Sequence, residues 1–174
     1  DNLAARTYTV SGTDAGLVDI TSAGVVTLKA SADYESKTGY SFNVIANDGA
    51  NNTTQAVVVS VTNLNDNAPV FTSIGTGTVA ENAVTSTVIY TAATSDADNL
   101  AARTYTVSGT DAGLVDITSA GVVTLKASAD YESKTSYSFN VIANDGANNT
   151  TQAVVVSVTN VNEAPVITSA ATAS

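Results

Sequence analysis

Apolar residues occupy every second position along two stretches in the second half of the chain. One stretch runs from Tyr137 to Ala143, and the other runs from Val154 to Val158. A period of two places alternate side chains on opposite faces of a β-strand, so both stretches predict strands with one buried face. No segment of the sequence shows the 3.6-residue apolar period of an amphipathic helix.

Further short runs rich in Val, Ile, Tyr and Thr are separated by turn residues, which extends the strand pattern. Seven short strands in one such region are typical of an immunoglobulin-like Greek-key β-sandwich, so the predicted fold class is all-β. Within residues 67–163 the predicted strands cover 70–72 (interrupted near Gly75 and Gly77), 85–94, 103–108, 114–118, 122–127, 137–143 and 151–159.

The chain repeats itself at an offset of 97 residues. Residues 1–64 match residues 98–161 except at two positions, Gly39 against Ser136 and Leu64 against Val161. We therefore expect a tandem array of β-sandwiches. Residues 1–66 are predicted to be an N-terminally truncated repeat and 67–163 a complete one. Residues 164–174 are predicted to be the start of a third repeat or a tail, because Ala-Pro recurs there.

Composition narrows the possible partners. The chain carries sixteen acidic and six basic residues, for a net charge of -10, which makes nucleic acid a poor partner. Cys and His are absent, so a metal site would use oxygen ligands, which suit Ca²⁺ or Mg²⁺. No apolar run is long enough to span a bilayer, so we expect no membrane insertion. The chain begins at Asp1 without a signal peptide, which predicts a fragment or a processed product.

Most acidic residues lie in short motifs near predicted strand ends. Asp14, Asp19, Asp111 and Asp116 lie elsewhere, and we expect them to be turn or solvent-facing residues. The segment 148–150 is interpreted as turn chemistry rather than as a glycosylation site. The twelve acids in motifs are Asp1, Asp33, Glu35, Asp48, Asp66, Glu81, Asp96, Asp98, Asp130, Glu132, Asp145 and Glu163.

Five ordered motifs carry a family resemblance. Residues 63–71 read Asn-Leu-Asn-Asp-Asn-Ala-Pro-Val-Phe and resemble the interdomain linker of cadherin repeats. The resemblance extends to Ala-Glu-Asn at 80–82, Asp-Ala-Asp at 96–98, Ala-Asp-Tyr-Glu at 129–132 and Ala-Asn-Asp-Gly at 143–146. The Ala, Thr and Asn bias and the near-identical copies resemble cadherin-like repeats of large bacterial surface adhesins.

The resemblance implies three Ca²⁺ ions at each junction between cadherin-type sandwiches. It assigns one outer ion to Asn65, the Asn67 carbonyl, Asp96, Asp98, Asp145 and a carbonyl near Ala101. It assigns the other two to Asp33, Glu35, Asp66, Asp98 and the Leu64 carbonyl, together with a Glu that the first copy lacks. Asn63 replaces the usual Asp of the family, which should weaken one inner ion. The second linker is one residue shorter, and its site would draw on Glu81, Asp130, Glu132, Asn160, Asn162 and Glu163. Asp1 and Asp48 are the first-copy counterparts of Asp98 and Asp145 and complete the candidate ligands.

The expected function is a calcium-rigidified repeat segment of an extracellular or cell-surface adhesin or stalk, which attaches cells to a surface or matrix. Its expected partners are other repeats of the array. One alternative is a homophilic or polysaccharide-binding module. Another is a protomer of an extracellular filament, with strands completed by a neighbouring chain. An enzyme is disfavoured, because the Asp130–Glu132 pair, which could resemble glycosidase carboxylates, recurs as Asp33 and Glu35 and lacks a nucleophile–base arrangement.

Overall fold

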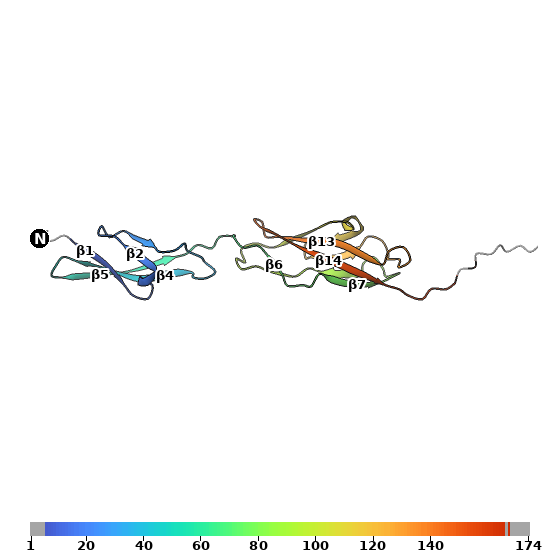
Figure 1. The fold of residues 1–174 in the computed structure, drawn as a ribbon, viewed down its shortest axis with the longest axis horizontal. Helices are drawn as coiled ribbons and strands as arrows, with labels where there is room; N and C mark the ends of the chain where they lie inside the picture. Colours follow the sequence, from blue (N-terminus) through green and yellow to red (C-terminus); the bar gives the residue numbers. More distant parts are fainter. Residues whose placement is uncertain (1–5, 166, 168–174) are drawn as a thin grey trace, which may run out of the picture. The chain divides into compact units, whose positions relative to one another are not determined.

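The computed structural model describes residues 6–165 and 167, and it separates the chain into two compact units (Figure 1). Unit 1 extends to Asn65 and unit 2 begins at Asp66. Strands dominate both units, and the only helical segments among the described residues are two short 3-10 turns. The predicted all-β fold class is confirmed.

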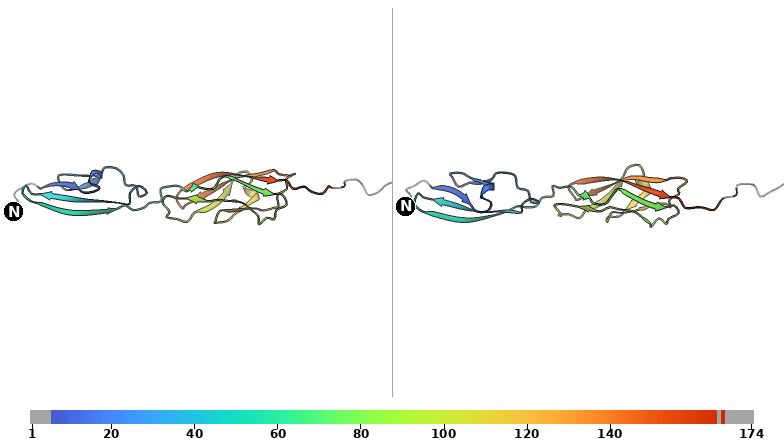
Figure 2. Two further views of the ribbon diagram at one scale, coloured as in Figure 1. Left: turned by 90° about the horizontal axis from the view of Figure 1, so that it is seen from below. Right: turned by 60° about the horizontal axis from the view of Figure 1, so that its bottom comes forward.

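Unit 1 contains a three-stranded antiparallel sheet in the order β1–β4–β5 and a separate antiparallel pair, β2–β3. The two long strands β4 and β5 lie side by side along the unit (Figure 2). The elements of unit 1 are β1 (Thr7–Ser11), the 3-10 turn η1 (Ala15–Leu17), β2 (Val18–Ile20), β3 (Val26–Leu28), β4 (Gly39–Asn47) and β5 (Asn52–Ser60).

Unit 2 is a two-layer sandwich. One layer is the sheet β10–β13–β14–β7, in which β7 runs parallel to β14, and another sheet has the order β11–β12–β8 (Figure 2). A short pair, β6–β9, accompanies them. The elements are β6 (Val70–Phe71), β7 (Thr76–Ala80), β8 (Val88–Thr91), β9 (Thr94–Ser95), β10 (Thr104–Ser108), η2 (Ala112–Leu114), β11 (Val115–Ile117), β12 (Val122–Leu125), β13 (Ser136–Asn144) and β14 (Asn149–Thr159).

The alternating stretches supply the core of unit 2, as predicted. Val141 on β13 and both Val154 and Val156 on β14 are fully buried, while Ser138 on β13 and Val155 on β14 are exposed. The three buried valines pack against Val123 of the facing sheet in one cluster. The expected strand at 85–94 is two strands, β8 and β9, because the chain leaves the ladder between Thr91 and Thr94.

Asp14 and Asp111 lie in turns, as predicted, but their side chains are buried rather than solvent-facing. The Asp111 side chain accepts a hydrogen bond from the Ser138 backbone amide at 2.7 Å and forms an ion pair with Lys134 at 2.9 Å. Asp14 repeats this arrangement with Ser41 and Lys37. A carboxylate can be buried when a cation and a backbone donor satisfy it. Asp19 and Asp116 are solvent-facing, as predicted.

Candidate metal-binding sites

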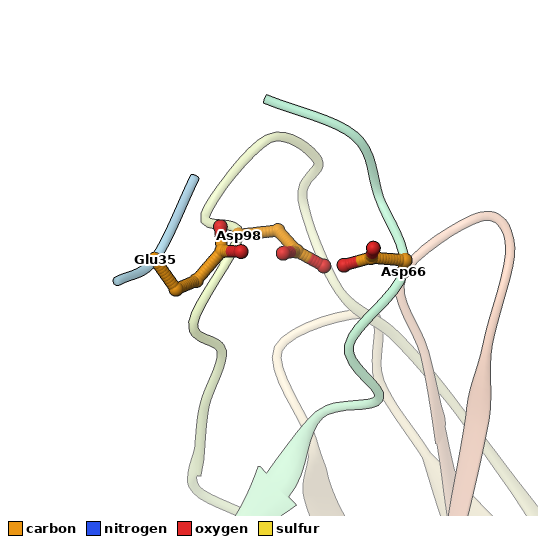
Figure 3. Close-up of side chains that lie close together, drawn as sticks. All are labelled: Glu35, Asp66 and Asp98. Carbon is orange, nitrogen blue, oxygen red and sulfur yellow. The ribbon is translucent and has the colours of Figure 1, made fainter. Parts of the chain in front are cut away.

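At the N-terminal end of unit 2, Asn67 holds two carboxylates close together. Its backbone amide donates to Asp98 Oδ2 at 2.7 Å, and its side-chain amide donates to Asp98 Oδ1 at 2.8 Å and to Asp66 Oδ1 at 3.0 Å. One oxygen of Asp66 lies within 4.8 Å of one oxygen of Asp98, and the two side chains point toward each other (Figure 3). Asp98 is buried, whereas Asp66 is exposed.

The loop after β9 places Asp98 by local hydrogen bonding. Asp96 Oδ1 accepts the backbone amides of Asp98 at 3.0 Å and of Asn99 at 3.4 Å, which closes a tight turn. Asn99 adopts a left-handed conformation with φ of 50°, which Asn tolerates better than most residues. The Asp-Ala-Asp motif therefore presents its second carboxylate to the linker.

The β13–β14 hairpin brings a further carboxylate and an amide to this end. Asp145 is 1% exposed, and its Oδ1 accepts the backbone amides of Ala147 at 2.8 Å and Asn148 at 2.6 Å. The Asn148 side chain donates to the Asn67 carbonyl at 3.2 Å and to Asp145 Oδ2 at 3.4 Å. The sequence interpretation missed Asn148 as a site residue. One sequence signal could have identified it: Asn148 follows Asp145 by three residues, just as Asn51 follows Asp48 in the other copy.

A second acidic cluster lies where the chain leaves β14. Glu81, Asp130 and Glu132 each offer an oxygen within 4.8 Å of the others. Glu81 is buried and accepts the backbone amides of Tyr131, at 2.9 Å, and of Val161. The sequence thus predicted correctly that these three acids lie together.

The linker that follows β14 contacts this cluster. Asn160 donates its side-chain amide to Glu132 at 3.1 Å, and Asn82, which the sequence interpretation did not assign, donates to Glu163 at 2.8 Å. Asn82 does so from a left-handed conformation with φ of 62°. Two predicted ligands, Asn160 and Glu163, therefore lie at the edge of the cluster.

Hydrogen bonds and neighbouring negative charges shift the pKa values of this cluster in opposite directions. Backbone hydrogen bonds from Val161 and Tyr131 lower the pKa of Glu81. A backbone hydrogen bond lowers the pKa of Glu132, but burial and the nearby Glu81 and Glu163 carboxylates raise it on balance. Glu81 is thus held as the anion, and a second negative charge beside it is disfavoured.

Unit 1 carries its own predicted ligands in similar local turns. Asp33 accepts the Ser36 hydroxyl at 2.7 Å and the Ser36 and Glu35 amides, and the hydrogen bonds from Ser36 lower its pKa most. Asp48 accepts the Asn51 and Ala50 amides, which lower its pKa, and it is exposed.

The other predicted ligands divide by position. Asn63, Leu64 and Asn65 form the C-terminal end of unit 1, and Leu64 is exposed. Ala101 and Asn162 are exposed residues of unit 2. Asp1 lies outside the described residues. The structure therefore gathers two groups in unit 2: Asp66, Asn67, Asp96, Asp98 and Asp145 at one end, and Glu81, Asp130, Glu132, Asn160 and Glu163 at the other.

Comparisons with known proteins show which proteins the chain resembles in sequence and in fold. No family model matches the chain. It is 37% identical over 142 residues to Protocadherin Fat 4 of Mus musculus, which covers 77% of this chain and 3% of that protein. The mouse Cadherin-23 EC22-24 structure superimposes with a TM-score of 0.81 at 23% identity, over 92% of this chain and 55% of that one. The human Protocadherin-24 EC1-2 structure superimposes with a TM-score of 0.77 at 23% identity, over 92% of this chain and 84% of that one.

The chain belongs to the cadherin repeat family. The predicted resemblance to cadherin repeats is thereby confirmed. Cadherins are extracellular adhesion proteins rather than enzymes, so this cadherin repeat chain belongs outside the cell or on its surface. It spans only a few per cent of the length of the curated cadherin it matches. Across the described residues, no helix has the length and apolarity needed to cross a membrane.

The donor sets of these cadherin repeats consist of carboxylate and amide oxygens. Such hard donors fit Ca²⁺, which accepts six to eight oxygens in a flexible shell, better than Mg²⁺, which demands a tight octahedron. Both groups also mix buried acids with exposed ones, so an ion could reach them from solvent.

Proposed function

We propose that this chain is a calcium-stiffened repeat segment of an extracellular adhesin or stalk, of the kind found on bacterial surfaces. In this proposal the repeats do not catalyse a reaction. They project or connect an adhesive part of a longer protein, and Ca²⁺ keeps the links between repeats stiff. The proposed partners are neighbouring repeats of the array, and a second copy of the chain is a further candidate.

The observation that carries the proposal is the convergence of Asp66 and Asp98. Their carboxylate oxygens lie within 4.8 Å, and Asp98 is buried. Like charges at this separation repel one another, and burial increases the cost of each charge. A divalent cation between oxygen donors would offset both costs.

The proposed ligands at the N-terminal end of unit 2 are Asp66, the Asn67 carbonyl, Asp96, Asp98, Asp145 and the carbonyl near Ala101. The resemblance adds donors of the preceding repeat, which are Asp33, Glu35, Asn63, Leu64 and Asn65. At the other end of unit 2 the proposed ligands are Glu81, Asp130, Glu132, Asn160, Asn162 and Glu163. Bound Ca²⁺ would supply positive charge, and the protein oxygens would fix its place.

The energetic effect would be large for a linker of a few residues. Extracellular modules bind Ca²⁺ with a Kd of about 10⁻⁴ to 10⁻³ M. A ligand present at about a hundred times its Kd stabilises the folded state by roughly 2.7 kcal/mol. Ions that join donors on both sides of a linker would therefore restrict its motion as well as stabilise each repeat.

Small-angle scattering tests the proposal directly. We expect the chain in millimolar Ca²⁺ to have a longer and less variable maximum dimension than the same sample in a chelator, and Mg²⁺ to be a poor substitute. Identical scattering in Ca²⁺ and in chelator would overturn the stiffening. Sedimentation of the same samples would reveal a second copy as partner through a concentration-dependent mass.

A further inference from the structure

Asn82 lies beside the second acidic cluster in an uncommon backbone conformation. Its φ of 62° is left-handed, and in the part of the chain that the structure describes Asn99 is the only other non-glycine residue with a positive φ. Asparagine tolerates this region better than most residues. The Asn82 side chain donates a hydrogen bond to Glu163 Oε1 at 2.8 Å, although the two residues lie 81 positions apart. Asn82 therefore connects the body of unit 2 to the linker that leaves it.

Backbone hydrogen bonds fix the segment that carries Asn82. The Asn82 amide donates to the Ala129 carbonyl at 2.9 Å, and the Glu81 amide donates to the Thr159 carbonyl at 3.1 Å. The segment is thus tied on one side to the end of β14 and on the other to the residue that precedes Asp130. A support held in this way positions a side chain more precisely than a mobile loop does.

The two Ala-Pro linkers supply an amide donor to their acid in different ways. In the first linker, Asn67 follows Asp66, and its side chain donates to Asp66 Oδ1 at 3.0 Å. The second linker has no residue at this position, because Ala-Pro directly follows Glu163. Here the amide comes from Asn82, outside the linker. The shorter linker therefore keeps the same kind of contact through a different residue.

We propose that Asn82 is a positioning residue, whose side-chain amide holds the Glu163 carboxylate at the second acidic cluster, in place to bind an ion. This inference rests on the proposed calcium binding and adds to it a residue that acts through Glu163. A glutamate side chain loses rotamer freedom when it is fixed. A hydrogen bond that fixes it beforehand lowers the cost of recruiting it to an ion.

A glycine at position 82 separates the role of the side chain from that of the backbone. Glycine adopts a φ of 62° without strain, so Asn82→Gly keeps the turn and removes the side-chain amide. Loss of a group that orients a metal ligand typically weakens metal binding by about 10–100-fold. The contact between Asn82 and Glu163 is exposed to solvent, so we expect the lower end of that range, about tenfold.

Nuclear magnetic resonance of the full, isotope-labelled chain tests the inference at each end of unit 2 separately. The Val161 backbone amide donates to Glu81, so its resonance reports on the second acidic cluster. The Asn67 backbone amide donates to Asp98 and reports on the group at the other end. In a Ca²⁺ titration, Asn82→Gly should raise the midpoint measured at Val161 by about tenfold and leave the midpoint measured at Asn67 unchanged.

A second pair of variants shows whether Asn82 acts through Glu163. Glu163→Ala alone should also raise the Val161 midpoint. Adding Asn82→Gly to Glu163→Ala should raise the midpoint no further, because the carboxylate that Asn82 holds is already gone. Circular dichroism in chelator should show that each variant folds, since both positions are exposed.

The outcomes separate this inference from the proposed function. An unchanged Val161 midpoint in Asn82→Gly, equal shifts at Val161 and Asn67, or additive shifts in the double variant would overturn the role of Asn82 and leave calcium binding intact. Absence of any Ca²⁺ response in the parent chain would overturn the proposed calcium binding itself, and this inference with it.

Discussion

Units 1 and 2 present nearly the same sequence in two different surroundings. Val59 and Val156 occupy matching positions, yet only Val156 is fully buried. Asp48 and Asp145 accept the same pair of backbone amides, yet Asp48 is exposed and Asp145 is buried. In unit 2, Val79, Ile89 and Tyr90 join the core cluster that contains Val156, and Asn148 links Asp145 to the Asn67 carbonyl. Burial is therefore set by the segments that pack against these residues rather than by the local sequence.

Local geometry, in contrast, is the same in both units. Asp33 and Asp130 each accept a serine hydroxyl three residues later at 2.7 Å. The ion pairs Lys37–Asp14 and Lys134–Asp111 differ by only 0.1 Å, at 2.8 and 2.9 Å. These hydrogen bonds and ion pairs therefore form in both units, whether or not residues 70–95 have a counterpart in the unit.

The largest contrast is expected from a matched pair of valine truncations. Val156→Ala should lower the unfolding free energy of unit 2 by about 2 kcal/mol, because it removes buried methyl groups and leaves a cavity. Val59→Ala should change the unfolding free energy of unit 1 by less than about 0.5 kcal/mol, because the Val59 side chain is partly exposed to solvent. Calorimetry of the two unfolding transitions measures both effects. Equal losses would contradict the difference in burial between the units.

Neutralising the buried acid of the ion pair should destabilise either unit, by less than the Val156→Ala truncation destabilises unit 2. Asp111→Asn should lower the unfolding free energy of unit 2 by about 1–2 kcal/mol at neutral pH, because it weakens a hydrogen-bonded, charged contact. Hydrogen bonding from the Ser138 amide, and then Lys134, lowers the pKa of Asp111. Its contribution is therefore complete above the ordinary Asp pKa of about 3.9 and disappears as the pH falls through the lowered value.

Urea unfolding of Asp111→Asn and the parent chain across this acid range measures that pH dependence. The deficit of the variant should vanish in acid. Asp14→Asn is the matched variant in unit 1, and its deficit should follow the same pH course. A deficit that persists below the lowered pKa would show that charge is not its source.

The smallest effect is expected at the one position where the shared strands differ. Ser136→Gly should destabilise unit 2 by about 0.5–1 kcal/mol, because glycine loses more conformational entropy in a strand. Gly39→Ser tests the converse in unit 1, where a Cβ would lie 2.7 Å from the Val59 carbonyl oxygen. Since unit 2 accepts a serine at this position, we expect little change. A severe loss in unit 1 would mean that the two ladders differ more than their registers indicate.

The sequence was sufficient to predict most of the strands, because alternation and turn residues act over a few positions, but it merged β8 and β9 into one strand. It also predicted that Glu81, Asp130 and Glu132 lie together, through the cadherin resemblance. It did not predict the burial of Asp111, because the partners that satisfy it, Lys134 and the Ser138 amide, lie 23 and 27 residues away. Nor did it predict the role of Asn148, because an Asn beside an Asp-Gly turn is ordinary turn chemistry until the linker carbonyl that it contacts is placed.

The central claim, that the acidic groups of this chain bind Ca²⁺, is tested most directly by measuring calcium binding to variants in which selected acids are neutralised. Isothermal titration should show Ca²⁺ binding to the parent chain with a Kd of about 10⁻⁴ to 10⁻³ M. The variant Asp66→Asn/Asp98→Asn should bind fewer ions, while Asp19→Asn/Asp116→Asn, which neutralises two exposed acids outside the sites, should bind as the parent does. Absence of binding to the parent, or equal binding by both double variants, would contradict the account.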